Sequence, residues 1–238
     1  KSMQQKTLTL EGKMEDIRII NRAKILLIEQ YKMSEAQAHR YIENDGTHTT
    51  AERAIPLGDI GLSQVVYHEV TAASGSLWMS FDATAGMEAS IELGVPFIER
   101  FASYRPAFAL LGPGLPPLEQ APVPVPEGCG GIVFTTDAVK EPEIFDEEFT
   151  GTESWVFGRQ DIVLPQNGTY YIVAFVPSGT PGKLWVAPGI RESFGFMDIV
   201  TLPRVIYKVR TFHEVFFWGG ILGWAYLAII LLLLLLFL

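Results

Sequence analysis

The sequence predicts a mainly β protein: an antiparallel β-sandwich, with a two-helix hairpin before it and a transmembrane helix after it. Three observations predict this arrangement. Residues 215–238 carry no charged side chain, residues 1–44 show helical periodicity, and the residues between them form short β-type runs that Pro and Gly separate. With 238 residues in all, the chain is long enough for one ordinary domain and a small appendage.

The charge is distributed unevenly along the chain. Residues 1–44 hold eight Lys and Arg against six Asp and Glu, a net charge of +2, whereas residues 45–238 hold ten against 21, a net charge of −11. Such a change of sign suggests two modules. An acidic body is a poor nucleic-acid binder, because phosphates repel it. Cys129 is the single cysteine, so a monomer has no internal disulfide and no thiol-based zinc or iron–sulfur site.

The first module, residues 1–44, is predicted to be a helical hairpin. Apolar residues recur at three- and four-residue spacings through Glu11–Tyr31, which predicts an amphipathic helix. A second helix is predicted to begin at Ser34, where the sequence SEAQ forms a capping box, and to run to about Glu43. The turn-forming sequence Asn44-Asp45-Gly46 then ends it.

The stretch INRAKILLIEQYKMSEAQAHRYIE resembles the core of the ANTAR domain, the RNA-binding module of bacterial transcription antiterminators. The positions that match the family pattern are Ala23, Lys24, Leu27, Ser34, Glu35, Ala38 and Tyr41. Ile25 and Ile28 depart from that pattern, and the family's third helix is missing after Glu43. The resemblance implies RNA as a partner through residues 1–44 alone, with Arg22, Lys24 and Arg40 as contacts. The alternative is a hairpin that merely packs or pairs.

A linker is predicted at residues 45–54 and the sandwich at residues 55–190. The Asn167-Gly168 pair predicts a tight turn between two strands. The Pro-rich segment Gly112–Gly128 predicts an extended loop, since proline donates no hydrogen bond to a strand ladder. The predicted strands are Val65–Val70, Gly75–Phe81, Glu88–Leu93, Ala107–Leu111, Gly131–Thr135, Glu153–Phe157, Asp161–Leu164, Thr169–Phe175 and Lys183–Ala187.

The segments RPAFALLGPGLP, VPEGCGGIVF, LPQNGTYYIVAFVP and GKLWVAPGIRESF carry a second resemblance. Through them, residues 51–238 are similar to microbial single-span membrane-anchored proteins of unassigned function, which have a jelly-roll-like or prepeptidase-C-terminal-like sandwich. This resemblance implies a sandwich outside the cytoplasmic membrane, whereas the ANTAR resemblance implies the cytoplasmic side. The two together indicate an unusual fusion with a seam near Asn44–Ala54, or one misleading resemblance.

Residues 191–214 are expected to be a juxtamembrane segment that leads into a single transmembrane helix at residues 215–238. At 1.5 Å per residue, a helix of this length exceeds the ~30 Å hydrocarbon layer of a bilayer. Gly219 and Gly223 form a small-xxx-small pair, which predicts close contact with another membrane helix or a second copy of this chain. Arg204, Lys208 and Arg210 ahead of the span favour a cytoplasmic body by the positive-inside rule.

No cofactor or catalytic constellation is predicted. The four histidines are scattered, and no hydrolase, zinc-protease, phosphate-loop or dinucleotide-binding motif is present. The dense carboxylates Glu143, Asp146, Glu147 and Glu148 suggest either a solvated acidic loop or a calcium site, because Ca²⁺ takes six to eight oxygen ligands.

The sequence therefore predicts a non-enzymatic sandwich that is anchored in a membrane and serves as an accessory or binding domain, for example as a subunit of a membrane complex. Membrane lipid and another membrane protein are the expected partners. The sandwich is expected outside the cytoplasm, although the positive-inside rule argues for the other side. The alternative function is an RNA-binding antitermination regulator that acts through the N-terminal hairpin.

Overall fold

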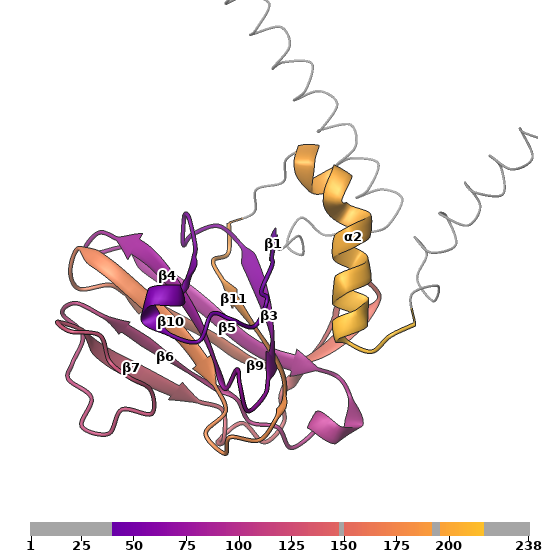
Figure 1. Ribbon diagram of the computed structural model, residues 1–238, viewed down its shortest axis with the longest axis horizontal. Helices are drawn as coiled ribbons and strands as arrows, with labels where there is room; N and C mark the ends of the chain where they lie inside the picture. The colour runs from indigo at the N-terminus through magenta and orange to yellow at the C-terminus, as the bar shows by residue number, and fades with distance from the viewer. Residues whose placement is uncertain (1–39, 148–149, 192–195, 217–238) are drawn as a thin grey trace, which may run out of the picture.

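The computed structural model describes residues 40–147, 150–191 and 196–216, and in it two β-sheets pack face to face (Figure 1). Sheet A has the strand order β1-β3-β11-β5-β9-β8 and sheet B the order β2-β4-β10-β6-β7. The prediction of a mainly β sandwich is confirmed. The strands of sheet A are β1 (Arg40–Ile42), β3 (Gln64–Val70), β5 (Glu88–Pro96), β8 (Glu143–Glu147), β9 (Thr152–Val163) and β11 (Gly182–Pro188). Those of sheet B are β2 (Ile55–Pro56), β4 (Ser76–Ala83), β6 (Ala107–Gly112), β7 (Gly130–Thr135) and β10 (Gly168–Phe175).

The strand pairs are nested like the two arms of one long hairpin. β6 pairs with β7 at its tip, and the pairs β5–β9, β4–β10 and β3–β11 follow outward, all antiparallel. Consecutive strands from β3 to β6 alternate between the two sheets, which is the rolled-up arrangement of a jelly roll. Only β1–β3 and β2–β4 are parallel among the pairs of the described residues.

The core lies between the sheets and follows the predicted alternation. Leu77, Met79 and Phe81 of β4 point inward, and so do alternate residues of β10 such as Tyr170 and Ile172; all of these are at most 2% exposed. Burying a side chain of this size contributes about 1.5–3 kcal/mol. The Asn-Gly turn is also confirmed, since Asn167 ends the β9–β10 connection and Gly168 opens β10 with a φ of 148°.

The Pro-rich segment after β6 is more than an extended loop, because it covers the outer face of sheet B. Val123 is buried in one apolar cluster with Trp78 and Phe175 on that face, and Leu118 and Val125 pack against the same cluster. Apolar residues placed between the prolines thus give the sheet a second, smaller apolar layer.

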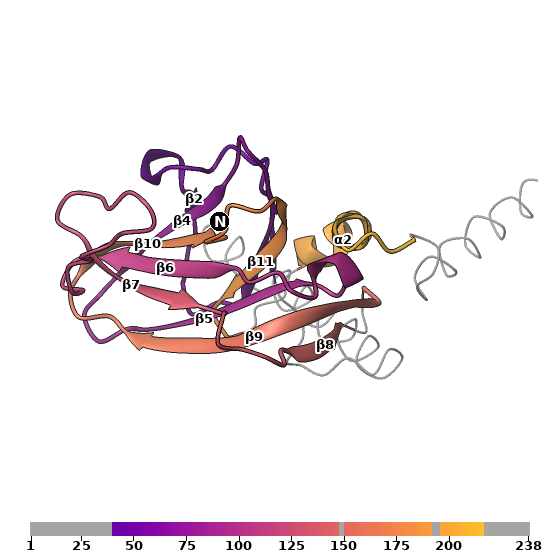
Figure 2. The same ribbon diagram turned by 90° about the horizontal axis from the view of Figure 1, so that it is seen from below.

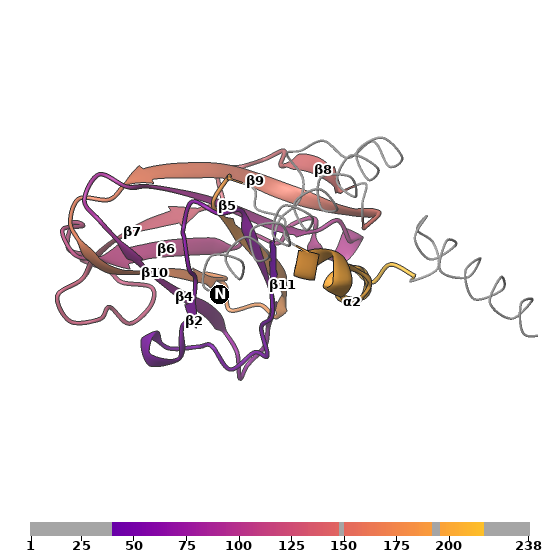
Figure 3. The same cartoon turned by 90° about the horizontal axis from the view of Figure 1, so that it is seen from above.

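Helix α2 (Phe196–Phe212) packs on the outer face of sheet A at one end of the sandwich, next to β11 (Figures 2 and 3), and its last residue contacts Tyr67 of β3 and Lys183 of β11. Ile206 and Val209 of α2 are buried. Beneath the helix, Trp185 of β11 lies opposite Gly94 of β5. A Cβ on Gly94 would fall 2.2 Å from the Trp185 ring, so glycine makes room for this indole.

Three local predictions differ from the structure. The helix expected to run to about Glu43 is replaced over Arg40–Ile42 by β1, because these residues pair in register with Gln64–Val66. The acidic loop is instead edge strand β8, in which Ile144 and Phe145 supply apolar side chains within the acidic run. The predicted runs Glu153–Phe157 and Asp161–Leu164 also join into the single strand β9.

The rest of the predicted hairpin and nearly all of the predicted span lie outside the described residues. Of residues 215–238, only Val215 and Phe216 are described, and Phe216 is 75% exposed. Within the part of the chain that the structure describes, no helix combines the length and apolarity needed to cross a bilayer.

Candidate functional site

The residues just before the apolar run form a tight helix end against sheet A. After α2 ends at Phe212, the amide of Glu214 donates to the carbonyl of Thr211 at 3.1 Å, and the amide of Val215 donates to that of Arg210 at 2.9 Å. This is the Schellman pattern, in which the residue with a left-handed backbone is usually glycine. Here it is Glu214, with a φ of 58°, the one positive φ of a non-glycine among the described residues.

A buried arginine ties this helix end to the β8–β9 turn. The guanidinium of Arg210 donates to the carbonyls of Thr150 and Gly151 on the turn and to that of Phe216 beyond the helix. Arg210 is only 3% exposed. Since an unpaired buried charge is costly, these three carbonyls fix both the helix end and the first residues of the apolar run.

A histidine beside Arg210 makes a chain of hydrogen bonds through the sheet. His213 Nδ1 lies 2.8 Å from the carbonyl of Val209 and must donate to it, so Nε2 accepts from the Ser154 hydroxyl at 3.0 Å. The indole of Trp185 donates to the same hydroxyl oxygen at 3.0 Å. Ser154 and His213 are each 5% exposed. Because the serine is buried beneath α2 and out of reach of a substrate, the hydrogen bond of this serine–histidine pair has a structural role.

Two cations hold the strained Glu214. Arg100 of the short 3-10 helix η3 (Glu99–Phe101) donates to its carboxylate at 2.8 Å, and Lys183 of β11 donates at 2.9 Å. These hydrogen bonds, that of Arg100 first, lower the pKa of Glu214 to about 2. Lys183 also donates to the carbonyl of Phe212 at 2.8 Å, as suits a cation at a helix C-terminus. We call this set the C-terminal junction; its members are Arg100, Ser154, Lys183, Trp185, Arg210, His213 and Glu214.

The chain enters the sandwich beside the place where it leaves. Tyr41 of β1 stacks on Tyr67 of β3 at a centroid distance of 5.8 Å, and Tyr67 contacts Phe212 of α2 at 4.9 Å. The carboxylate of Glu43 is paired with Lys208 and, at 2.9 Å, with Arg204, both on α2. The two ends of the described region are therefore in direct contact.

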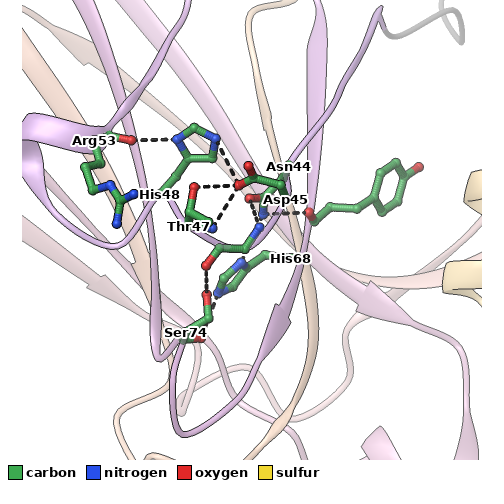
Figure 4. Close-up of polar contacts among 9 residues, drawn as sticks. Asn44, Asp45, Thr47, His48, Arg53, His68 and Ser74 are labelled. Carbon is green, nitrogen blue, oxygen red and sulfur yellow. Dashed lines mark hydrogen bonds and ion pairs between the residues drawn. The ribbon is translucent and has the colours of Figure 1, made fainter.

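A second buried histidine secures this entry (Figure 4). His68 Nε2 donates to the carbonyl of Ser74 at 3.1 Å, so its Nδ1 accepts from the side-chain amide of Asn44 at 3.0 Å. Asn44 also donates to the carbonyl of Tyr67 at 3.1 Å, and the Ser74 hydroxyl donates to the carbonyl of Gly46 at 2.8 Å. We call Asn44, Gly46, His68 and Ser74 the N-terminal junction.

The predicted linker at residues 45–54 is tied to sheet B and to itself. The amide of Trp78 donates to the carbonyl of His48 at 2.9 Å. His48 Nδ1 in turn donates to the carbonyl of Arg53 at 2.6 Å, and Asp45 accepts from both the amide and the hydroxyl of Thr47 (Figure 4). These contacts make the segment part of the sandwich.

Burial sets the protonation of both buried histidines. It lowers the pKa of His68 and that of His213 to about 4 each, because a charged imidazole would lose its hydration in these sites. Both rings are therefore neutral near pH 7.

Of the predicted RNA-binding and helix-pairing residues, the structure describes Arg40 alone, so their grouping stays a prediction. Arg40 lies in β1, where its backbone is in register with Gln64. The other predicted residues, Arg22, Lys24, Gly219 and Gly223, lie outside the described residues.

The predicted calcium ligands are divided between the two faces of β8. Glu143 and Glu147 share one face of the strand and Asp146 lies on the other, since side chains alternate. Glu147 accepts from the Thr150 amide at 3.0 Å, and Glu148 lies outside the described residues. Among the described residues, no three acidic, histidine or cysteine side chains are grouped closely enough to hold a metal ion. The calcium site stays a prediction.

Sequence reasoning missed the C-terminal junction, because no local spacing signals it. Ser154 and His213 are 59 positions apart, and Arg100 and Glu214 are 114 apart. Arg210 was interpreted as part of a flanking positive charge, although it is a buried structural residue.

The sequence profile of the ANTAR domain matches residues 8–45, which confirms the resemblance of the N-terminal segment. The sequence matches no curated protein. Similar solved structures include the pre-peptidase C-terminal domain of a collagenase from Bacillus anthracis (8% identity, 56% of this chain and 91% of that one, TM-score 0.29).

Two other similar structures are a periplasmic inhibitor of g-type lysozyme, PliG, from Aeromonas hydrophila, and CorA, a surface-associated copper-binding protein from Methylomicrobium album BG8. The first is 14% identical over 65% of this chain and all of that one, with a TM-score of 0.32. The second is 10% identical over 66% of this chain and 99% of that one, with a TM-score of 0.30. At these values the likeness is too low to transfer a binding activity.

Proposed function

We propose that this protein is a non-enzymatic binding or accessory domain, which residues 215–238 hold at a membrane surface. One observation carries the proposal: the C-terminal junction fixes the chain on sheet A immediately ahead of a run of residues without charge. The buried Arg210 and the left-handed Glu214 fix the direction of the chain at Val215. If residues 215–238 form a membrane anchor, both residues would fix the orientation of the sandwich relative to the bilayer.

The anchor itself is argued from the sequence. An uncharged segment of this length satisfies its backbone hydrogen bonds in a bilayer if it is helical. Trp218, Trp224 and Tyr226 lie in its first half, where an aromatic belt would meet the lipid–water interface. Gly219 and Gly223 would then pair the helix with another membrane protein or a second copy.

For the side of the membrane, we propose the outside of the cytoplasmic membrane, on the resemblance of residues 51–238 to anchored proteins of that topology. The positive-inside rule argues for the cytoplasmic side, but the three cations on which that argument rests make contacts within the protein. Arg204 and Lys208 pair with Glu43, and Arg210 is buried, so all three have structural roles independent of topology.

Membrane extraction tests the anchor. After gentle lysis and an alkaline carbonate wash, the full chain should stay with the membranes, and a chain stopped after Phe216 should be released. A partner should co-purify with the full chain in stoichiometric amount, and less of it with the Gly219→Leu, Gly223→Leu variant. A full chain that is soluble after gentle lysis would overturn the proposal.

Thiol labelling tests the side. In a Cys129→Ser background, Ala121→Cys places one thiol in an exposed stretch of the Pro-rich segment. A membrane-impermeant maleimide should label it in intact cells. Labelling only after the membranes are opened would place the sandwich inside.

RNA binding is the second candidate function, and the ANTAR match at residues 8–45 favours it. A gel shift of the full chain with hairpin RNA should show a complex that Arg22→Gln, Lys24→Gln weakens. Lys6→Gln, outside the matched residues, is the control. Binding that is unchanged by the double substitution would remove this candidate, as would an extracytoplasmic N-terminus.

A further inference from the structure

A cleft beside the C-terminal junction has the features of a small-ligand site. It has a volume of about 280 Å³ and lies between the η3 segment, the connection after β7 and the β10–β11 turn; Arg100, Tyr104, Arg105, Asp137, Ser178 and Thr180 line it. η3, the short magenta helix of Figure 1, lies near the C-terminal end of α2. Because Arg100 also binds Glu214, the cleft adjoins the start of the apolar run.

Arg105 is held in place in this cleft without an acidic partner. Its Nη1 donates to the carbonyls of Ala102 and Tyr104, both at 3.0 Å, and its guanidinium lies 5.4 Å from the ring centroid of Phe157. No carboxylate of the described residues forms an ion pair with it. Its Nε and Nη2 are thus preorganised donors, a geometry that suits the oxygens of a phosphate.

The other wall of the cleft carries the opposite charge. Asp137 is exposed and, like Arg105, forms no ion pair within the described part of the chain. The hydroxyls of Ser178 and Thr180, 2.8 Å apart, lie at the third wall and can donate to a phosphate. The Tyr104 hydroxyl donates to the carbonyl of Thr180 at 3.0 Å, which ties this wall to the η3 segment.

We propose that this cleft binds an aminoalkyl phosphate, with the phosphate on Arg105 and the ammonium on Asp137. A phosphate alone would be repelled by Asp137, and an amine alone by Arg105 and Arg100, so a ligand that carries both charges fits best. A phosphoethanolamine lipid headgroup and a free aminoalkyl phosphomonoester share this chemistry. The lipid source rests on the proposed function, since the anchor would bring the cleft to the headgroup layer.

Calorimetry on the detergent-solubilised full chain tests the shared chemistry, with O-phosphoethanolamine and inorganic phosphate as probes. Phosphoethanolamine should bind more tightly than phosphate. Arg105→Gln should weaken binding of both by about tenfold or more, as expected for the loss of a charge-assisted contact. Arg159→Gln, on β9 and outside the cleft, should leave both affinities unchanged.

Asp137→Asn gives a second test that does not disturb packing, because Asp137 is exposed. It should bind inorganic phosphate at least as tightly as the wild type does, because the repulsion is removed, and lose the preference for phosphoethanolamine. Failure of both probes to bind, or affinities that Arg105→Gln and Asp137→Asn leave unchanged, would overturn the site.

Lipid discs identify the source. Phosphatidylethanolamine, and not phosphatidylcholine, should stay bound when the full chain is released from mixed discs into native mass spectrometry. Binding of the free probe without lipid retention would support the site with a free phosphomonoester as its ligand. Carbonate extraction tests the anchor separately, so a failed anchor and a failed site give different results.

Discussion

The two junctions of the sandwich lie next to each other on sheet A, and each contains a buried neutral histidine, yet they differ in what surrounds it. At the N-terminal junction, His68 is held by the uncharged groups of Asn44 and Ser74. At the C-terminal junction, His213 is accompanied by Arg210, Lys183 and the Arg100–Glu214 pair. Where the chain enters as a strand, neutral hydrogen bonds hold the buried histidine, and the charges of the Glu43 pairs with Arg204 and Lys208 lie at the exposed surface. Charges are used where a helix must stop at a defined residue ahead of an apolar run.

The largest loss of stability is expected when the buried charged residue of the C-terminal junction is replaced. Arg210→Met should lower the free energy of unfolding by about 4 kcal/mol, because it leaves the buried carbonyl of Thr150 and the carbonyls of Gly151 and Phe216 without their donor. Arg159→Met is the control: Arg159 is 46% exposed and lies 3.7 Å from Glu92, so its loss should cost less than about 1 kcal/mol. Urea unfolding measures both. Equal effects would show that Arg210 does not hold the helix end.

Acid should weaken both junctions. The histidine pKa values of about 4 in the folded protein lie below the ordinary value of 6.5, so the unfolded chain binds more protons between these limits. Stability is therefore complete above about pH 6.5 and falls toward pH 4, by about 3 kcal/mol for each histidine. Unfolding free energies measured across this range should show a shallower slope in His68→Gln and in His213→Gln. A slope that neither substitution changes would contradict the burial argument.

The next largest losses of stability are expected when one uncharged hydrogen-bonding side chain is removed from each junction. Ser154→Ala leaves the Trp185 indole and His213 Nε2 without partners, and Asn44→Ala removes the donor to His68 and Tyr67. Each should cost about 1–2 kcal/mol. Ser178→Ala, at an exposed turn, is the control and should change stability little. Near-UV circular dichroism should show the Trp185 environment altered in Ser154→Ala alone.

The smallest effect concerns the backbone at Glu214. Glu214→Ala keeps a Cβ at a φ of 58° and loses both cation contacts, whereas Glu214→Gly loses the contacts and relieves the strain. The glycine variant should be about 1 kcal/mol more stable than the alanine variant. High salt should narrow the difference between wild type and either variant. An alanine variant that equals the glycine variant would mean that the left-handed conformation is not kept.

The strands that could be predicted from the sequence are those whose pattern is local. Alternating Leu77, Met79 and Phe81 predicted an inward face, and Asn167-Gly168 predicted a turn, because one residue's neighbours decide these features. β1 could not be predicted: Ser34 and the residues after it favour a helix locally, and the strand exists only through pairing with β3, whose partner residues are 24 positions away.

The candidate site was even less accessible to sequence reasoning. His213, Arg210 and Glu214 acquire their roles from Ser154, Thr150 and Arg100, which are distant in the chain and lie in three different connections or strands. The spacing of residues in the sequence predicts which side chains are buried and where turns lie. It does not predict hydrogen bonds between residues that are distant in the chain.

The central claim is that the sandwich holds the chain rigidly up to the start of the apolar run. Hydrogen exchange on the full chain in lipid discs tests it most directly. The amides of His213, Glu214 and Val215, which donate within the helix end, should exchange as slowly as those of β10 in the core. Exchange of these amides at the rate of exposed backbone would contradict the claim and would show that a flexible linker joins the sandwich to the apolar run.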